Sequence, residues 1–496
     1  MRLLVWPITL LAVVASLAAA ATARAATNPA ATAIFRLSGG DVAAASGMSR
    51  YGYVTLNAWN ADRIAELKAE NPGIKVLVYK DMASTRSYAV HDGVDDALLP
   101  TGIGYAYASN QHPEWFLTDT TGSPMEWGSY GGHWWMDIGD PAYQQKWLDN
   151  VAAELRAQGW DGVVIDNAMA DPQWYLAGRT IAKYPTKDEY RDATRSFLAR
   201  VGPGLTSRGF LVLPNISDPT TSLWNDWIQF TSGANFEHWT KWSGAAAGSG
   251  YIDGDYWLMH ADMLKATQDQ GKIFLANTTS TTTTDTHTMR YARASFLLWW
   301  NGGPSALAFS VNATDPWSPE WTIDIGQPAG PAYQTNGTWR RDYTGGTVIA
   351  NPSKTTSSTT TLETTYQTPE GTSTTQITLQ PTSGIILRSV APAPTPAPTP
   401  TPTPTPTPDT TAPSLTVTSP TTGSTVKGRF TIQATAGDAS GIAKVTFVID
   451  GRLVSTDTTA PYGYTATAKK GWHTIVVTAY DQAGNATSVT LAVRVR

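Results

Sequence analysis

The sequence predicts an α/β fold, a TIM (β/α)8 barrel with a small C-terminal β-sandwich subdomain, followed by a linker and a separate all-β domain. Three observations predict it. Apolar, β-branched runs alternate with helical patterns over residues 31–328. A repeat of proline and threonine fills residues 391–408. Short alternating strand patterns without helices follow over residues 409–496.

The first 25 residues have the pattern of a secretory signal peptide. Arg2 supplies a positive charge, residues 3–17 are mostly apolar, and Ala23-Arg24-Ala25 fits a cleavage site. A transmembrane anchor is the alternative, but it needs about 20 apolar residues. We therefore expect a secreted, extracellular protein with no membrane attachment once the signal peptide at residues 1–25 is removed. Export of a chain without cysteine is typical of bacteria.

Residues 31–328 carry the barrel pattern, eight strands alternating with helices. The expected strands are Ala33–Leu37, Tyr53–Leu56, Lys75–Tyr79, Gly162–Ile165, Phe210–Leu213, Trp227–Phe230, Lys272–Ala276 and Ser305–Phe309. Helical spacing of apolar residues predicts helices over Ala61–Asn71, Tyr143–Gln158, Asp188–Leu205 and Thr288–Trp300. A doubly wound open sheet is the alternative, but no glycine fingerprint follows the first strand.

Three further segments complete the chain. Residues 329–390 return to strand patterning, and we interpret them as a small β-sandwich packed on the barrel. The repeat at residues 391–408 is expected to be an extended polyproline II spacer. Residues 409–496 have six or seven short strands separated by turn signals, as in a β-sandwich. Within that domain Trp472 is either a sugar-binding platform or a packing residue, and we favour packing.

The composition excludes several classes of protein. With 35 basic and 40 acidic residues the net charge is −5, which argues against a nucleic-acid partner. Zero cysteines exclude disulfides, thiolate metal sites and a cysteine nucleophile. The 7 histidines show no metal spacing, so we expect no metal and no cofactor. The 20 tryptophans favour a carbohydrate ligand only weakly, because such rings also fill cores.

Two carboxylates are the catalytic candidates, because a barrel gathers its chemistry at the C-terminal ends of its strands. Asp166 ends the apolar run of the fourth strand, where an unpaired charge costs free energy unless it has a function. A helix N-cap is the alternative role. Glu237 follows the sixth strand among aromatic residues, which disfavour the ionised form and suit a proton donor. For Glu237 a surface position in a loop is the alternative.

Other residues near strand ends are candidates for binding substrate. Some end a strand, and others lie in the aromatic segments around residues 134–137 and 236–239. They are Asn57, Lys80, Asp81, Trp135, Asn167, Asn215, His238, Trp239 and Asn277. For each polar member, a turn or cap is the alternative role. Asp137 is expected to cap the fourth helix.

Two segments of the barrel resemble a known family. Trp135–Tyr143 (WMDIGDPAY) and Gly159–Asn167 (GWDGVVIDN) are similar to the glycoside hydrolase-like barrels of extracellular bacterial enzymes, which are related to polygalactosaminidase-type and α-galactosidase-type barrels. In related α-glycosidase barrels a fourth-strand Asp is the nucleophile and a sixth-strand acid is the proton donor. The resemblance therefore implies these roles for Asp166 and Glu237. Residues Asp409–Pro413 and Ala479–Asn485 resemble bacterial Ig-like modules.

These observations predict a secreted, monomeric glycoside hydrolase that acts on a polysaccharide or oligosaccharide. We expect a retaining mechanism, in which Asp166 attacks the anomeric carbon and Glu237 first protonates the leaving oxygen and then activates water. An inverting mechanism, with the two carboxyl groups farther apart, is the alternative. Two alternatives stay open. One is a carbohydrate-binding barrel without activity, and the other is a transglycosylase.

Overall fold

The computed structural model describes residues 35–37, 48–128, 130–217, 219–246, 248–311, 317–390 and 409–496. The chain divides into two compact units, one up to residue 393 and one from residue 394 onward. The expected signal peptide (1–25) and the expected linker (391–408) lie outside the described residues. Within the described ranges, no helix has the length and apolar character needed to cross a membrane.

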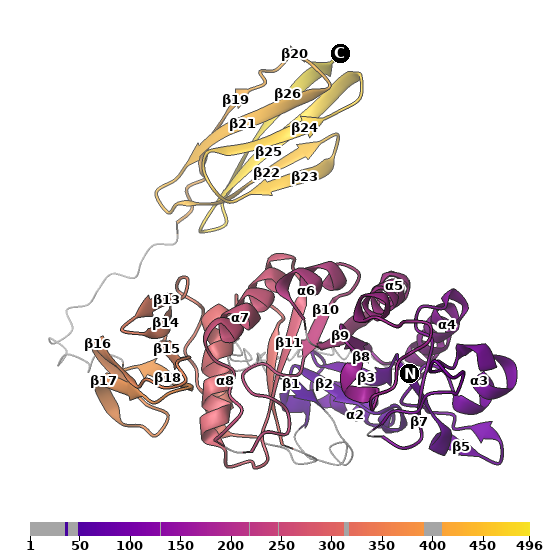
Figure 1. Ribbon diagram of the computed structural model, residues 1–496. Helices are drawn as coiled ribbons and strands as arrows, with labels where there is room; N and C mark the ends of the chain where they lie inside the picture. Colours follow the sequence, from indigo (N-terminus) through magenta and orange to yellow (C-terminus); the bar gives the residue numbers. More distant parts are fainter. Residues whose placement is uncertain are drawn as a thin grey trace, which may run out of the picture. The chain divides into compact units, whose positions relative to one another are not determined.

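Eight parallel strands form the sheet of the first unit, in the order β1-β2-β3-β8-β9-β10-β11-β12. Since β1 also contacts β12, the sheet curves into a barrel with helices outside it (Figure 1). The predicted TIM barrel is confirmed. The strands are β1 (Phe35–Leu37), β2 (Tyr53–Leu56), β3 (Lys75–Asp81), β8 (Gly162–Met169), β9 (Leu211–Ser217), β10 (Gly233–Phe236), β11 (Ile273–Thr279) and β12 (Ala306–Ser310).

Helix α4 (Pro141–Gln158) begins and ends at recognisable cap residues. Asp140 accepts hydrogen bonds from the backbone N–H of Ala142 and Tyr143, and Gly159 ends the same helix at φ 82°. Asp140, and not Asp137, therefore caps the fourth helix. The helices are α2 (Arg63–Glu70), α3 (Tyr105–Gln111), α4 (Pro141–Gln158), α5 (Lys187–Thr206), α6 (Thr221–Ile228), α7 (Gly254–Asp269) and α8 (Thr286–Trp299).

Side chains alternate between the inside and the outside of the barrel along each strand, and this produces two apolar cores. Leu77, Val164 and Leu213 belong to a cluster inside the barrel, whereas Val78, Ile165 and their neighbours pack outward against the helices. The inward positions become polar toward the C-terminal ends of the strands. The C-terminal end of the barrel interior is therefore polar, and the part below it is apolar.

The sixth strand differs from its prediction. Trp227 and Ile228 end α6, so the apolar run Trp227–Phe230 is not a strand. The strand is β10, with the sequence Gly-Ala-Asn-Phe. A Cβ on Gly233 would lie 1.8 Å from the carbonyl oxygen of Ile273, so the close approach of β11 requires glycine there. A short strand that contains Gly and Asn lacks the apolar run by which strands are recognised.

A long excursion follows β3 and fills the chain up to α4. It contains α3, two short hairpin strands, and a ribbon in which β4 pairs antiparallel with β7. Its strands are β4 (Ser84–Arg86), β5 (Val90–His91), β6 (Val94–Asp95) and β7 (His133–Trp135). This ribbon lies at the C-terminal end of β3 and brings new side chains to the mouth of the barrel.

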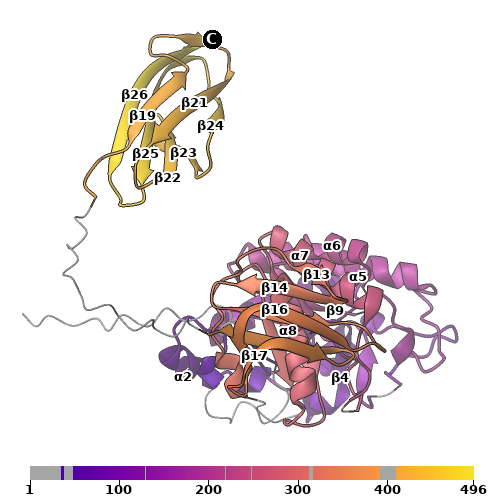
Figure 2. The ribbon, with the colours of Figure 1, turned by 90° about the vertical axis from the view of Figure 1, so that its left-hand side faces the viewer.

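Six antiparallel strands follow the barrel, in the order β13-β14-β15-β18-β16-β17. One face of this sheet packs on α8 (Figure 2), while Ile349, Leu362 and Leu387 belong to a separate apolar cluster. The strands are β13 (Tyr333–Thr335), β14 (Thr338–Tyr343), β15 (Gly346–Asn351), β16 (Ser358–Gln367), β17 (Ser373–Leu379) and β18 (Ser383–Ser389).

The second unit is a β-sandwich with its own core, built around Phe447, Ile475 and Val493. A sheet of β19-β21-β24 faces a sheet of β20-β26-β25-β22-β23. Trp472 is 61% exposed, so the expectation that it packs in the core is wrong. The strands are β19 (Ser414–Ser419), β20 (Thr425–Val426), β21 (Arg429–Gly437), β22 (Ile442–Ile449), β23 (Arg452–Asp457), β24 (Tyr462–Thr467), β25 (Gly471–Asp481) and β26 (Ala486–Val495).

Candidate active site

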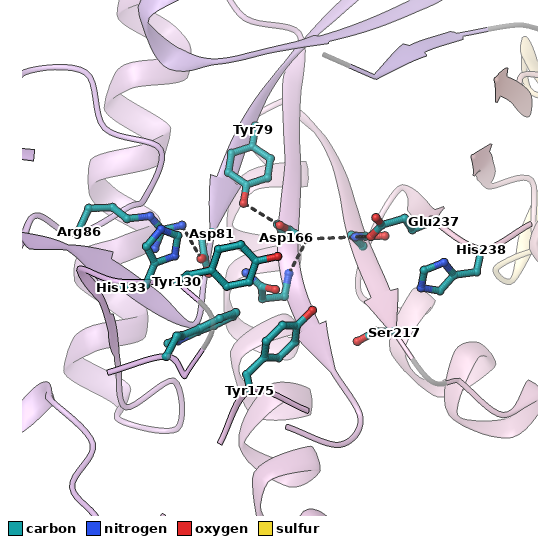
Figure 3. A pocket seen from close by; sticks show the side chains of 13 residues that line it. Tyr79, Asp81, Arg86, Tyr130, His133, Asp166, Tyr175, Ser217, Glu237 and His238 are labelled. Carbon is teal, nitrogen blue, oxygen red and sulfur yellow. Dashed lines mark hydrogen bonds and ion pairs between the residues drawn. The ribbon is translucent and has the colours of Figure 1, made fainter. Parts of the chain in front are cut away.

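A cavity of about 240 Å³ opens at the C-terminal ends of the barrel strands. Asp166 and Glu237 both face it, from neighbouring parts of the sheet (Figure 3). The side chains that line it come from four barrel strands or the loops after them: Tyr79, Asp81, Arg86, Trp127, Tyr130, His133, Asp166, Asn167, Tyr175, Asn215, Ser217, Glu237 and His238. The mouth of the barrel therefore holds the expected pair of carboxylates in one cavity.

Asp166 lies at a bulge in β8. Ile165 pairs with Pro214 and Ala168 with Ile216, so β8 has one more residue than β9 between these pairs. Asn167 occupies the left-handed region at φ 63°, which Asn tolerates better than most residues. Because of the bulge, Asp166 and Asn167 both line the cavity, although strict alternation would turn one of them outward.

Three donors hold the carboxylate of Asp166. The Tyr79 hydroxyl donates to Oδ2 at 2.6 Å. The backbone N–H of Asn167 and the Asn215 side-chain amide donate to Oδ1 at 2.9 Å and 3.0 Å. With donors on both oxygens, these contacts favour the anionic form and fix its orientation.

Asn215 joins the two carboxylates through one nitrogen atom. Its Nδ2 donates to Asp166 Oδ1 at 3.0 Å and to Glu237 Oε2 at 3.1 Å. Asn235 donates to Asn215 Oδ1 at 2.8 Å, which fixes the amide so that its NH2 group faces the two acids. Because one nitrogen contacts both acids, the two acceptor oxygens lie no more than about 6 Å apart.

The two carboxyl groups differ in their freedom to exchange a proton. Within the described part of the chain, Glu237 accepts a hydrogen bond only from Asn215, and only at Oε2. Burial, together with the charges of Asp81 and Glu237, raises the pKa of Asp166 to about 6. The hydrogen bonds from Tyr79 and Asn215 oppose this rise. At neutral pH, Asp166 is therefore mostly ionised.

A network of polar side chains forms the wall on the β3 side. Asp81 accepts from Arg86 Nη2 at 2.8 Å, from Ser84 Oγ at 2.5 Å and from the backbone N–H of Ala83 at 2.8 Å. Burial and the Arg86 guanidinium lower the pKa of His133 to about 4, so its ring is neutral at neutral pH. Arg86 and His133 both come from the β4–β7 ribbon. The Arg86–Asp81 ion pair and the neutral ring of His133 make this wall nearly neutral overall.

Aromatic rings form another part of the lining. Trp127 lies 4.6 Å from Tyr175 and 4.7 Å from Trp135, between ring centroids. Tyr130 stacks on His133 at 5.4 Å. Flat faces of this kind suit the C–H faces of sugar rings.

Of the nine residues predicted to bind substrate, four line the cavity. They are Asp81, Asn167, Asn215 and His238. The other five do not belong to the lining. Asn57 precedes the short helix after β2, and Asn277 is buried, where its Oδ1 accepts from Ser310.

Lys80, Trp135 and Trp239 are buried, and the expectation that they contact substrate is wrong. Lys80 follows Tyr79 on β3, so alternation points it outward, where it pairs with Glu154 at 2.6 Å. Trp135 lies behind Trp127 and supports its ring. Trp239 donates to the Ala292 carbonyl at 3.0 Å.

Seven lining residues were missed: Tyr79, Arg86, Trp127, Tyr130, His133, Tyr175 and Ser217. Alternation was enough to find two of them, because Tyr79 and Ser217 lie two residues from the candidates Asp81 and Asn215. The others lie in the loops after β3 and β8, where no period in the sequence marks which side chains turn toward the cavity.

One group of acidic side chains among the described residues is close enough to share a cation. The carboxylates of Asp409, Asp438 and Asp481, in the second unit, lie within 4.8 Å of one another. Asp481 already accepts two hydrogen bonds from Asn485. The group belongs to the β-sandwich of the second unit.

Comparison with known families assigns both units. A model described as hypothetical glycosyl hydrolase family 15 matches residues 68–347, which is more than half of the chain. A bacterial Ig domain model matches residues 413–493. Both resemblances noted in the sequence are confirmed.

Solved structures are similar either to most of this chain at low identity or to a short part of it at higher identity. An α-amylase from Geobacillus thermoleovorans, complexed with acarbose, is 11% identical, with 73% of this chain and 99% of that chain covered and a TM-score of 0.41. An endo-β-1,4-mannanase from Thermotoga petrophila is 10% identical, with 88% and 83% covered and a TM-score of 0.27. The fibronectin(III)-like modules of Clostridium thermocellum CbhA are 31% identical, with 17% and 97% covered and a TM-score of 0.16. No curated protein matches the chain.

Proposed function

The chain belongs to hypothetical glycosyl hydrolase family 15, and from this premise we propose that it cleaves an extracellular polysaccharide or oligosaccharide by a retaining, two-carboxylate mechanism. In this proposal Asp166 is the nucleophile and Glu237 is the acid and base. The substrate binds with its anomeric carbon above Asp166.

The separation set by Asn215 is the observation that carries the proposal. Retaining enzymes hold their two carboxyl groups about 5–5.5 Å apart, whereas inverting enzymes leave about 6.5–9.5 Å for a water molecule. One amide nitrogen that contacts the two carboxylates at 3.0 Å and 3.1 Å limits the distance between the two acceptor oxygens to about 6 Å, below the inverting range, and this supports a retaining mechanism. The space between the two acids suits direct attack on the sugar.

The surroundings of the two acids support their separate roles. Donors on both oxygens of Asp166 favour the anion that a nucleophile requires. Glu237 has one oxygen without such a donor among the described residues, so it is able to carry a proton to the leaving oxygen. After the glycosyl-enzyme forms, the same group accepts a proton from the attacking water.

We also propose that the enzyme acts outside the cell as a monomer. The motive is the signal-peptide pattern of residues 1–25, with Arg2 before an apolar stretch. A polysaccharide too large to import requires an exported enzyme. Sizing of the protein recovered from culture medium tests both statements, and retention of the protein inside the cell would contradict the first.

Glu237→Gln tests the role of the acid. A natural sugar leaving group needs a proton in the transition state, but an activated aryl group does not. We therefore expect kcat/KM to fall at least about 100-fold on glycans and much less on an aryl glycoside. Azide should partly restore the aryl reaction and give a glycosyl azide, because a small anion attacks the glycosyl-enzyme without base assistance.

Two comparisons make this test specific. The wild type is first assayed on a panel of neutral, amino-sugar and uronic-acid polysaccharides, and its products are identified. The polysaccharide that it cleaves is the glycan used for Glu237→Gln. Glu114→Gln, which changes an acid that is 62% exposed, is the matched control and should keep wild-type rates. Equal losses on glycan and aryl glycoside would show that Glu237 binds or shapes the cavity without donating a proton.

A further inference from the structure

Beyond Glu237 the chain carries an exposed pair of aromatic rings. Trp242 lies in the loop after β10 and is 42% exposed, and Tyr256 lies in the first turn of α7 and is 46% exposed. Their ring centroids are 5.9 Å apart. Trp242 is also 5.4 Å from His238, which lines the cavity. The three rings therefore form a continuous surface that starts at the cavity.

The loop that carries Trp242 is held in place by its own backbone. The N–H of Trp242 donates to the Gly250 carbonyl at 2.9 Å, and that of Ile252 donates to Thr240 at 2.9 Å. The N–H of Ser243 donates to His238 Nδ1 at 3.3 Å. Trp239, three residues before Trp242, is 1% exposed. The loop thus buries one tryptophan as an anchor and leaves the other at the surface in a fixed position, which lowers the entropic cost of binding.

The position of Glu237 gives this surface a direction. A proton donor must lie within hydrogen-bond reach of the leaving oxygen, so the leaving group extends past the acid. Asp166 and the Tyr79–Asp81–Arg86 wall lie on the opposite side of Glu237 from His238 (Figure 3). A leaving group that extends in this direction would lie over His238 and reach Trp242 and Tyr256.

We propose that His238, Trp242 and Tyr256 form the subsite for the leaving-group sugar residues, so that the substrate is an oligosaccharide or polysaccharide with at least one sugar beyond the cleaved bond. This proposal rests on the proposed function. The C–H face of a pyranose stacks on the indole of Trp242, and a further sugar reaches the Tyr256 ring.

The test compares two kinds of leaving group. The probes are the hexaoses of α-1,4-glucose, β-1,4-glucose, β-1,4-mannose and β-1,4-N-acetylglucosamine, and the glycosyl fluorides of the same sugars, whose leaving group has no ring. Trp242→Ala should lower kcat/KM on the cleaved hexaose at least about tenfold, mainly through KM, in keeping with loss of burial of one apolar ring face. Turnover of the corresponding fluoride should stay within about twofold, because bond cleavage there needs no sugar in the subsite.

Two further variants keep the result specific. Trp242→Tyr should restore most of the hexaose activity, because it restores an aromatic face. Trp59→Ala removes another exposed tryptophan of the barrel, 52% exposed and outside the cavity lining, and should leave both rates unchanged. Unchanged hexaose kinetics in Trp242→Ala would overturn the subsite while the proposed function stands. Equal losses on hexaose and fluoride would also overturn it. A folded wild-type protein that turns over none of these probes, and none of the neutral, amino-sugar and uronic-acid polysaccharides used to test Glu237→Gln, would overturn the proposed function and the subsite with it.

Discussion

Asp166 combines two demands that oppose each other. Burial and the charges of Asp81 and Glu237 raise its pKa to about 6, while Tyr79 and Asn215 donate hydrogen bonds that favour the anion. A buried anion costs free energy of folding, but the same anion is the group that attacks the sugar. Function and stability are therefore in conflict at this residue.

Asp166→Asn separates the two effects. We expect turnover to fall at least about 100-fold, because an amide is not a nucleophile. Folding raises the pKa of Asp166, so the folded barrel binds this proton more tightly than the unfolded chain does. The stability gained from the proton is complete below about pH 4 and is lost as the pH rises through about 6. Asn does not ionise, so at pH 8 the free energy of unfolding of the Asp166→Asn barrel should exceed that of the wild type by on the order of 1–3 kcal/mol. This difference should disappear at pH 4.

Thermal unfolding at pH 4 and pH 8 measures this difference, and Asp188→Asn, at a carboxylate that is 65% exposed, is the control. A variant that keeps more than about a tenth of wild-type activity would exclude Asp166 as the nucleophile. A barrel less stable than the wild type at pH 8 would contradict the account of its burial.

Tyr79→Phe tests how the anion is held. The Tyr79 hydroxyl lowers the pKa of Asp166, so its removal should raise that pKa. The acid limb of the kcat/KM profile, expected near pH 6 in the wild type, should move to higher pH. Tyr53→Phe removes another hydroxyl from inside the barrel, one that donates to Pro304, and should leave the limb in place. An acid limb that does not move in Tyr79→Phe would show that another group controls it.

At the scale of elements, strands with apolar runs could be predicted and irregular pieces could not. β2 has the predicted bounds, and β3, β8, β9, β11 and β12 begin within one residue of them. The β8 bulge, which turns both Asp166 and Asn167 to the cavity, has no signal in the apolar pattern. β10 was missed for a related reason, since Gly233 serves the close approach of β11 and not an apolar core.

The candidate site could be predicted to a similar extent. Strand ends locate Asp166, Asn215 and Glu237, because the C-terminal ends of parallel strands meet at one mouth. The β4–β7 ribbon adds Arg86 and His133, whose positions depend on tertiary packing between residues 45 or more apart in the chain. Local sequence carries little information on such contacts.

At the scale of the whole molecule, the two units differ in what they contribute. The described residues that line the cavity all belong to the first unit. A protein that ends at Ser389, the last residue of β18, should therefore keep its rate on soluble oligosaccharides and lose adsorption to insoluble polysaccharide. Rate assays and pull-down on the same preparation check this. A large fall in rate on the soluble substrate would contradict the separation of catalysis from the Ig domain.

The covalent intermediate on Asp166 is the most direct test of the account. Glu237→Gln protein is mixed with an activated aryl glycoside of the sugar that the wild type releases, and the peptides are analysed by mass spectrometry. We predict one glycosyl group on the peptide that contains Asp166, because the first step no longer needs the acid and the second step lacks its base. A glycosyl group on another residue, or products of inverted configuration without an adduct, would contradict it.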